Sequence, residues 1–305
     1  MKTVDPELKT ALESFPGFNI TSEFLSVIRQ FPAKPPLQTP LYEEVIIEPD
    51  GDEEPLRCLL IDPIPSADNR PAMLYFHGGG YIFGSPEITL PTAQKLAEDV
   101  GCLIILPDYR LAPEHPFPAA LEDGRRVLSW LEANADRLRL DKTRIAIGGD
   151  SAGGGHAVVL TAALGHKTSI KPSCLFLAYP MLDNETGVDG EGGTSIWTPA
   201  NNLFGWQSYL GTTGLEEKIA QGAVPSKIEN LQDFPPTFLA TGTLDLFFNE
   251  NLEFVKKLQT QGVATEKHVF QGAYHGFDVL VPDAEISQNF HKTCVDSLKR
   301  FLDID

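Results

Sequence analysis

Short, continuously apolar runs alternate with helix-like patterns, and this alternation constrains the fold of the 305-residue chain most strongly. The run 102–106 has no polar side chain apart from a cysteine, which is typical of a strand covered on both faces. Strands are expected at 41–48, 55–61, 72–76, 102–106, 144–147, 174–178, 237–240 and 266–270. Strands that alternate with helices predict an α/β fold with a mostly parallel central sheet flanked by helices.

Helices are expected between these strands, at 90–100, 118–138, 152–164, 249–260 and 284–302. Two stretches interrupt the alternation. Residues 1–40 contain two short helix patterns, which begin at Asp5-Pro6 and at Ser22, and then a proline-rich joint. Residues 183–234 are rich in Gly, Thr, Asn and aromatic residues. Because a structureless loop of that length is unusual, a helical insertion is expected there.

Composition and charge exclude several classes of protein. The chain has 42 acidic and 24 basic residues, a net charge of −18, which opposes binding to nucleic acid or to an anionic membrane surface. No apolar run approaches the length of a membrane span, and no signal peptide is expected. The four cysteines lack C-x-x-C spacing, so no zinc site is expected. Buried, reduced thiols of a cytoplasmic protein are favoured over a disulfide.

A serine stands where a strand pattern runs directly into a helix pattern. The segment reads Gly149-Asp150-Ser151-Ala152-Gly153 and matches G-x-S-x-G. In hydrolases this motif forms a sharp turn that presents the serine hydroxyl, and its glycines permit close approach of strand and helix. A glycine-rich turn with an ordinary serine would give the same letters. The expected strand and helix on either side favour Ser151 as a nucleophile.

The base that such a serine needs is expected to be His275, one of seven histidines. It lies in a loop directly after the expected strand 266–270, where catalytic groups usually lie. In hydrolases with this serine motif, the base follows both the nucleophile and the acid along the chain. The rival histidines follow Ser151 too closely or lie in an expected strand or helix: His156, His166, His268 and His291.

The acid that orients the base is expected to be Asp245. It follows the strand 237–240 by a few residues and lies between Ser151 and His275 in the chain. Three alternatives stay open. Glu250 belongs to the next helix, where it caps the start, Asp233 precedes the strand at the wrong end of the sheet, and Asp278 is local to His275.

Acyl transfer also needs hydrogen-bond donors for the oxyanion of the tetrahedral intermediate. The segment His77-Gly78-Gly79-Gly80 follows an early strand, as the H-G-G-G element of esterases does. We assign the backbone N–H groups of Gly78, Gly79 and Ala152 as the oxyanion hole. A three-glycine run alone indicates a flexible turn, but beside the serine motif the catalytic interpretation is favoured.

These pieces together resemble the hormone-sensitive-lipase-like carboxylesterases, also called the GDXG lipolytic family. Four blocks occur in family order over about residues 41 to 305: H-G-G-G-Y-I-F-G at 77–84, D-Y-R-L-A-P-E-H-P-F-P-A-A at 108–120, G-G-D-S-A-G-G at 148–154 and Y-H-G-F at 274–277. The second block carries no catalytic group. We expect it to support the site, with Glu114 and His115 in polar contacts.

The resemblance implies an α/β-hydrolase core at 41–182 and 235–305 and a helical cap at 1–40 and 183–234. It implies a serine carboxylesterase that hydrolyses short- to medium-chain esters through an acyl-enzyme, without a metal or an organic cofactor. The expected partner is a small-molecule ester, and a homodimer is possible. A hormone receptor that lacks the catalytic histidine, an amidase and a lyase are alternatives on the same scaffold.

The sequence says least about the residues that line the substrate pocket. The family's Asp-Pro-Leu around the acid is replaced by Asp245-Leu246-Phe247, and its Asn-Leu-Ala after the serine turn by Gly155-His156-Ala157. Candidate pocket residues are Tyr81, Trp197, Phe204, Trp206 and Leu246, and candidates on the N-terminal piece are Phe15, Phe18 and Phe24. About half of the cap aromatics are expected only to pack the cap onto the core.

Overall fold

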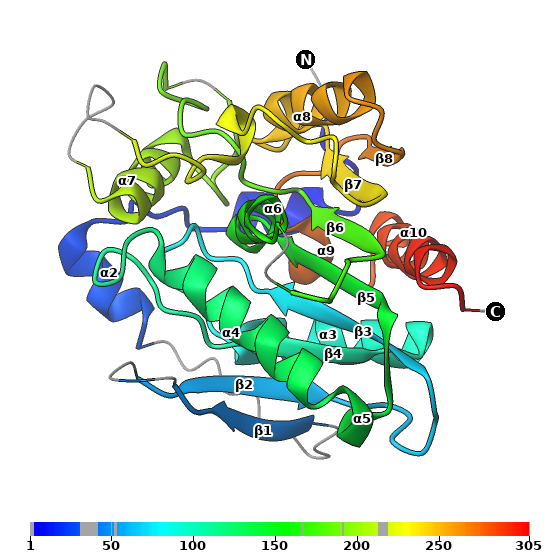
Figure 1. Ribbon diagram of the computed structural model, residues 1–305. Coiled ribbons are helices and arrows are strands. Elements are labelled where there is room, and N and C mark those ends of the chain that lie inside the picture. The colour runs from blue at the N-terminus through cyan, green and yellow to red at the C-terminus, as the bar shows by residue number, and fades with distance from the viewer. Residues whose placement is uncertain are drawn as a thin grey trace.

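The computed structural model describes residues 3–30, 42–49, 51, 54–165, 168–190, 192–212 and 219–304. Within these residues an eight-stranded sheet has the order β1-β2-β4-β3-β5-β6-β7-β8 (Figure 1). The pairs β1–β2 and β2–β4 are antiparallel and the remaining pairs are parallel, so the prediction of a mostly parallel sheet is confirmed. The strands are β1 Tyr42–Ile47, β2 Leu56–Ile61, β3 Arg70–Phe76, β4 Leu103–Pro107, β5 Leu140–Asp150, β6 Cys174–Ala178, β7 Thr237–Gly242 and β8 Thr265–Phe270.

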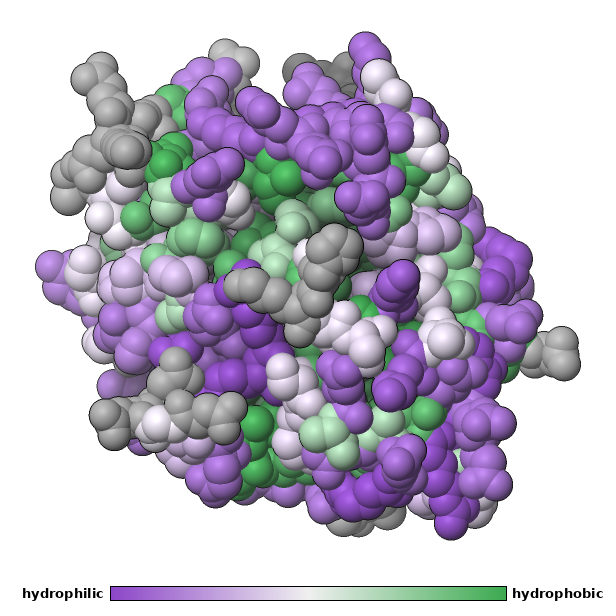
Figure 2. Space-filling model, viewed as in Figure 1, coloured by the Kyte–Doolittle hydropathy of each residue, from purple (hydrophilic) through white to green (hydrophobic). Residues whose placement is uncertain are grey.

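Helices cover both faces of this sheet. Alternate residues of each strand point to opposite sides, so apolar strands present an apolar surface for helices to cover on each face. Leu74 joins one core with helices α4, α6 and α8, while Met73 joins the other with α3 and α10. The helices are α1 Lys9–Ser14, α2 Ser22–Ile28, α3 Pro86–Val100, α4 Ala119–Ala133, α5 Ala135–Leu138, α6 Ala152–Ala163, α7 Pro199–Leu210, η1 Pro225–Lys227, α8 Phe248–Thr260, α9 Phe277–Leu280 and α10 Glu285–Phe301. Figure 2 shows a largely hydrophilic surface on this side of the molecule.

Several helix boundaries differ from those expected. The first helix begins at Lys9, because Asp5 accepts a hydrogen bond from the Glu7 N–H (2.9 Å) and so forms a turn. Helix α3 begins four residues early, at Pro86, where proline fits the first helical turn. The expected helix 118–138 is divided at Asn134, and α9 was not expected. The proline-rich joint, the Asp50 turn residue and His166 lie outside the described residues.

The N-terminal piece is attached to two different parts of the molecule. Near its start, the Asp5 N–H donates to Gly272 O (3.1 Å) and the Tyr274 hydroxyl donates to Leu8 O (3.2 Å). Further on, the side chain of Asn201 in α7 accepts from the Ile20 N–H (2.8 Å) and donates to the carbonyl of Phe18 (2.9 Å). Helix α7 therefore binds the N-terminal piece directly.

Arg29, at the end of α2, makes a third attachment. Its guanidinium donates to the carbonyls of Ile82 (2.8 Å) and Ala112 (2.6 Å) and pairs with Glu114 (2.8 Å). These partners belong to the blocks at 77–84 and 108–120 that carry the family resemblance, so Arg29 joins α2 to the loops around the site. Glu114 therefore does make the polar contact that the sequence suggested.

All four cysteines, Cys58, Cys102, Cys174 and Cys294, are buried and free. Among the described helices, none has the length and apolar character needed to cross a membrane. Within the same residues, no group of three or more His, Cys, Asp or Glu side chains is placed to hold a metal ion.

Candidate active site

Ser151 lies at a sharp turn between β5 and α6. Its φ of 54° and ψ of −121° are unusual for a residue with a side chain, and such strain is typical of an exposed nucleophile. The turn is held by two main-chain bonds, from the Ser151 N–H to Ala178 O and from the Met181 N–H to Ser151 O, each 2.9 Å. A Cβ at Gly153 would clash with the carbonyl of Phe76, so α6 starts directly against β3.

His275 lies in the loop that follows β8, between the serine and an aspartate. Its Nε2 is 2.9 Å from Ser151 Oγ, and its Nδ1 is 2.8 Å from Asp245 Oδ2. When Nδ1–H donates to the carboxylate, Nε2 is free to accept the serine proton. The three side chains therefore form a line of hydrogen bonds that matches a serine triad.

The loops that carry the acid and the base are bound to each other. The Thr243 N–H donates to Phe270 O (3.0 Å), and the Leu244 N–H donates to Ala273 O (2.9 Å). The Asp245 side chain is buried, and its second oxygen accepts the Phe247 N–H (2.9 Å). This arrangement fixes the distance between carboxylate and imidazole before any substrate binds.

The electrostatic surroundings favour the protonated imidazole. Burial alone lowers the pKa of His275, but the charge and the hydrogen bond of Asp245 raise it, and the charges of Asp150 and Asp278 raise it further. The result is a pKa above the ordinary value of 6.5. The His275 imidazole becomes positive when it takes the serine proton, and the neighbouring carboxylates stabilise that positive form.

The glycine loop lies against the nucleophile. A Cβ at Gly78 would clash with Asp150 Oδ2 and would lie 3.4 Å from Ser151 Cβ. Gly79 has a φ of 125°, which side chains rarely adopt, and a Cβ there would clash with Phe83 O. Ala152 is the first residue of α6, where backbone N–H groups lack partners within the helix. The structure thus brings Gly78 and the start of α6 to Ser151.

The rival histidines and acids have other partners. His156 is buried among aromatic rings and its burial lowers its pKa to about 3; His268 and His291 pair with Glu266 and Asp99. Glu250 accepts the Leu182 N–H (2.6 Å), Asp278 accepts the Tyr179 hydroxyl (2.9 Å), and Asp233 is exposed. Among the described carboxylates, Asp245 is the one hydrogen-bonded to His275.

The candidate pocket residues join one hydrophobic cluster that also contains Ala152. Tyr81, Trp197, Trp206 and Leu246 are buried in it, and Phe204 packs against it partly buried. On the N-terminal piece, Phe18 packs against the same cluster and contacts the rings of Phe15 and Phe24. Sequence reasoning missed further members, which occur singly in the chain without a motif: Ile20, Leu25, Met181, Tyr209 and Val224.

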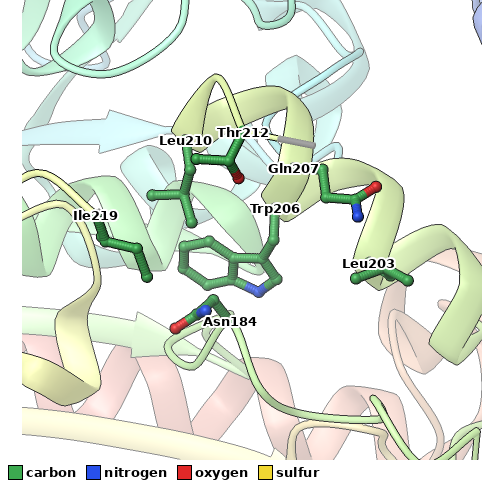
Figure 3. Close-up of a pocket in the computed structure, with 7 residues that line it drawn as sticks. All are labelled: Asn184, Leu203, Trp206, Gln207, Leu210, Thr212 and Ile219. Carbon is green, nitrogen blue, oxygen red and sulfur yellow. The ribbon is translucent and has the colours of Figure 1, made fainter. Parts of the chain in front are cut away.

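A small cavity opens beside α7, and Trp206 forms part of its wall (Figure 3). The indole ring of Trp206 lies between Asn184 and the side chains of α7 in this view, while Ile219 faces it from the opposite segment. The cavity is lined by Asn184, Leu203, Trp206, Gln207, Leu210, Thr212 and Ile219. Trp206 also contacts Tyr81 edge-on, with ring centroids 4.9 Å apart, so it connects this cavity to the glycine loop.

The sheet, the strained serine and the hydrogen-bonded histidine define an α/β hydrolase. A family model described as the alpha/beta hydrolase fold matches residues 73–279. Carboxylesterase NlhH of Mycobacterium tuberculosis is 37% identical over 295 residues, which cover 92% of each chain. Esterase LipI of the same organism is 30% identical over 284 residues, 90% of this chain and 88% of LipI.

Solved structures agree with these relatives. A bacterial heroin esterase superposes with a TM-score of 0.87 and 28% identity, covering 98% of both chains. Esterase LipW of Mycobacterium marinum gives a TM-score of 0.84 and 27% identity over 98% of this chain and 96% of its own. The chain belongs to the hormone-sensitive-lipase-like carboxylesterases of the α/β-hydrolase fold, and it is a serine carboxylic ester hydrolase.

Proposed function

We propose that the protein hydrolyses short- to medium-chain carboxylic esters with Ser151, His275 and Asp245 as its catalytic residues. The observation that supports this assignment is the unbroken line of hydrogen bonds, 2.9 Å from serine to histidine and 2.8 Å from histidine to aspartate. Such a line connects a nucleophile to a base and the base to an orienting acid.

In the first half-reaction, Ser151 Oγ attacks the ester carbonyl while His275 Nε2 takes the hydroxyl proton. The N–H groups of Gly78, Gly79 and Ala152 donate to the oxyanion. The imidazolium, steadied by Asp245, returns the proton to the departing alcohol. Water then attacks the acyl-enzyme with His275 again as the base, and the carboxylic acid leaves.

Substrate size is proposed to be set by a cap made of residues 1–40 and 183–234. The aromatic cluster around Tyr81, Trp197 and Trp206 supports this proposal, because it fills space beside Ala152 with bulky side chains. An apolar pocket of limited size favours acyl groups of about two to eight carbons. Each methylene that fits should add up to about 0.8 kcal/mol of transition-state binding.

A panel of p-nitrophenyl esters of increasing acyl length, with a matched anilide, tests the proposed reaction. We expect ester turnover that peaks at a short or medium chain and is abolished in Ser151→Ala. Preferred cleavage of the anilide would indicate an amidase instead. Tight ligand binding without any turnover would indicate a receptor, although the contact of His275 with Ser151 supports catalysis.

We also propose that the protein works in the cytoplasm and as a homodimer. Four buried thiols without a disulfide support a reducing compartment. The dimer rests on the sequence-based expectation alone. Light scattering on the purified protein tests it, since a monomeric mass at working concentration would refute the dimer.

A further inference from the structure

Two aspartates that the triad does not use lie near His275. Asp150 ends β5 directly before Ser151, and Asp278 stands in α9, three residues after His275. Both are partly buried, and both act electrostatically on the imidazole. Since Asp245 already occupies Nδ1 and Ser151 faces Nε2, these two carboxylates cannot hydrogen-bond to the ring nitrogens at the same time.

A tyrosine binds one of these carboxylates. The Tyr179 hydroxyl donates to Asp278 Oδ1 (2.9 Å). The ring of Tyr179 also packs against His275 edge-on, with centroids 5.0 Å apart. One side chain therefore contacts the catalytic imidazole with its ring and a carboxylate with its hydroxyl.

The backbone at Tyr179 shows that this placement is constrained. Its φ is 37°, in a region that bulky residues rarely adopt, and its N–H donates to Ala240 O (2.7 Å) on β7. Such strain persists only where the surrounding structure holds it, and it is concentrated at functional sites. The Asp150 carboxylate is closely packed as well, because a Cβ on Gly78 would clash with its Oδ2.

The charged groups around Asp150 and Asp278 are the two carboxylates themselves and the imidazole of His275. Burial raises the pKa of Asp150 to about 7, and the charge of Asp278 adds to that rise. Burial likewise raises the pKa of Asp278, while the Tyr179 hydrogen bond lowers it. The other titratable groups that face the two aspartates stay neutral in the working range, because burial raises the pKa of each: Tyr75, Tyr109, Tyr179 and Cys294.

We propose that Asp278, held by Tyr179, is a positioning residue that stabilises the imidazolium form of His275 during acyl transfer. This inference rests on the proposed role of His275 as the base. Neither aspartate touches the reacting atoms. Asp278 acts through the imidazole, which gains the serine proton and becomes positive, so that a nearby negative charge lowers the barrier.

The pH profile of kcat/KM for an uncharged acetate ester tests the proposal in the full-length enzyme. Asp278→Asn removes a charge and leaves an oxygen that still accepts the Tyr179 hydroxyl. Asp150→Asn is the comparison variant: Asp150 has a pKa of about 7 and carries little charge over the acid limb, so this variant should move the limb less. Loss of a negative charge lowers the pKa of His275, so the acid limb should move to lower pH by about 0.5 to 1 unit. On the plateau, kcat should fall about 3- to 10-fold with KM nearly unchanged.

Two controls separate this effect from a structural one. Asp278→Glu restores the charge and should return the acid limb toward that of the wild type. Asp233→Asn removes a charge at an exposed position before β7 and should leave the profile unchanged. A general loss of packing would lower activity at every pH without moving the limb.

An activity-free measurement distinguishes failure of this proposal from failure of the proposed function. NMR titration of His275 in the unliganded protein reports its pKa even if ester hydrolysis is not the reaction. A pKa that falls in Asp278→Asn supports the proposal. An unchanged His275 pKa and an unchanged acid limb in Asp278→Asn would overturn it. A larger shift of the limb in Asp150→Asn than in Asp278→Asn would overturn it as well.

Discussion

The core and the proposed cap meet in the apolar cluster that contains Ala152, next to Ser151, but they are held by different forces. In the core, Ser151, Asp245 and His275 follow strands β5, β7 and β8, and main-chain bonds join the loops of the acid and the base. The pieces of the proposed cap are held mainly by the apolar cluster around Trp197 and Trp206. Side-chain hydrogen bonds add to it: Arg29 binds carbonyls of the core loops, and Asn201 joins α7 to the N-terminal piece. The catalytic side chains are therefore positioned by the sheet and its loops, whereas the proposed cap offers side-chain contacts that a substitution can weaken without disturbing the triad.

Loss of the nucleophile should have the largest effect. Ser151→Ala should reduce kcat by roughly 10⁴-fold or more and leave the fold intact, because no neighbouring group replaces the hydroxyl. His275→Ala should match it. Steady-state kinetics with a short-chain ester, alongside a thermal melt, measure both. Substantial activity in Ser151→Ala would place the chemistry elsewhere.

Loss of the acid should cost a similar amount or less. Asp245→Asn keeps the base but favours the wrong tautomer, so kcat should fall by up to about 10⁴-fold. In the wild type, the rate should decline as pH falls through a value above 6.5, since the pKa of His275 is raised. Full activity in Asp245→Asn would transfer the role to Glu250 or Asp278.

Loosening the cap should have an intermediate effect and spare the chemistry. Arg29→Met removes the hydrogen bonds to Ile82 and Ala112. We expect kcat/KM for the preferred ester to fall about tenfold, a loss that corresponds to the free energy of about one charged hydrogen bond. Acyl-length preference should flatten. Arg137→Met, at an exposed position of α5 far from α2, is the matched control (Figure 1). An unchanged acyl-length profile in Arg29→Met would show that α2 does not shape the pocket.

The stability of the contact between core and proposed cap should fall at acid pH. His156 in α6 lies beneath Tyr81 and Tyr209, with ring centroids 4.9 and 5.5 Å away. Burial lowers its pKa to about 3 from 6.5, and the neighbouring His77 contributes to the decrease. The unfolded chain therefore binds a proton that the folded chain does not. The stability that this histidine contributes is present above about pH 6.5 and is lost as pH falls toward 3.

His156→Leu removes this linkage and should have the smallest effect at neutral pH. Between pH 6 and 5, the free energy of unfolding should fall less steeply than in the wild type, by up to about 1.4 kcal/mol per pH unit. Urea unfolding at the two pH values measures the slopes. Equal slopes in the two proteins would show that His156 titrates normally in the folded state.

Much of the core could be predicted because its signals are local. The strand 174–178 was predicted with the observed bounds of β6, since an apolar run between turn residues specifies a buried strand by itself. The motif around Ser151 likewise specifies a turn within five residues. Local patterns therefore indicated both the sheet and the residues that the structure brings together at its carboxyl end.

The unpredicted features depend on contacts between distant residues. Arg29 binds carbonyls more than fifty residues away, and Asp5 binds the loop of His275 at Gly272. The N-terminal piece therefore supports the catalytic loop as well as α7, which no local pattern indicated. Tyr179 and Asp278 are 99 positions apart, and each looks ordinary in its own segment.

Covalent labelling of the wild-type protein tests the central claim most directly. A fluorophosphonate reacts with a serine that a neighbouring base activates, so peptide mass spectrometry identifies the nucleophile. We predict one label per chain on Ser151, abolished in Ser151→Ala and strongly slowed in His275→Ala. A stoichiometric label on another serine, or ester hydrolysis that continues with Ser151 unlabelled, would contradict the account.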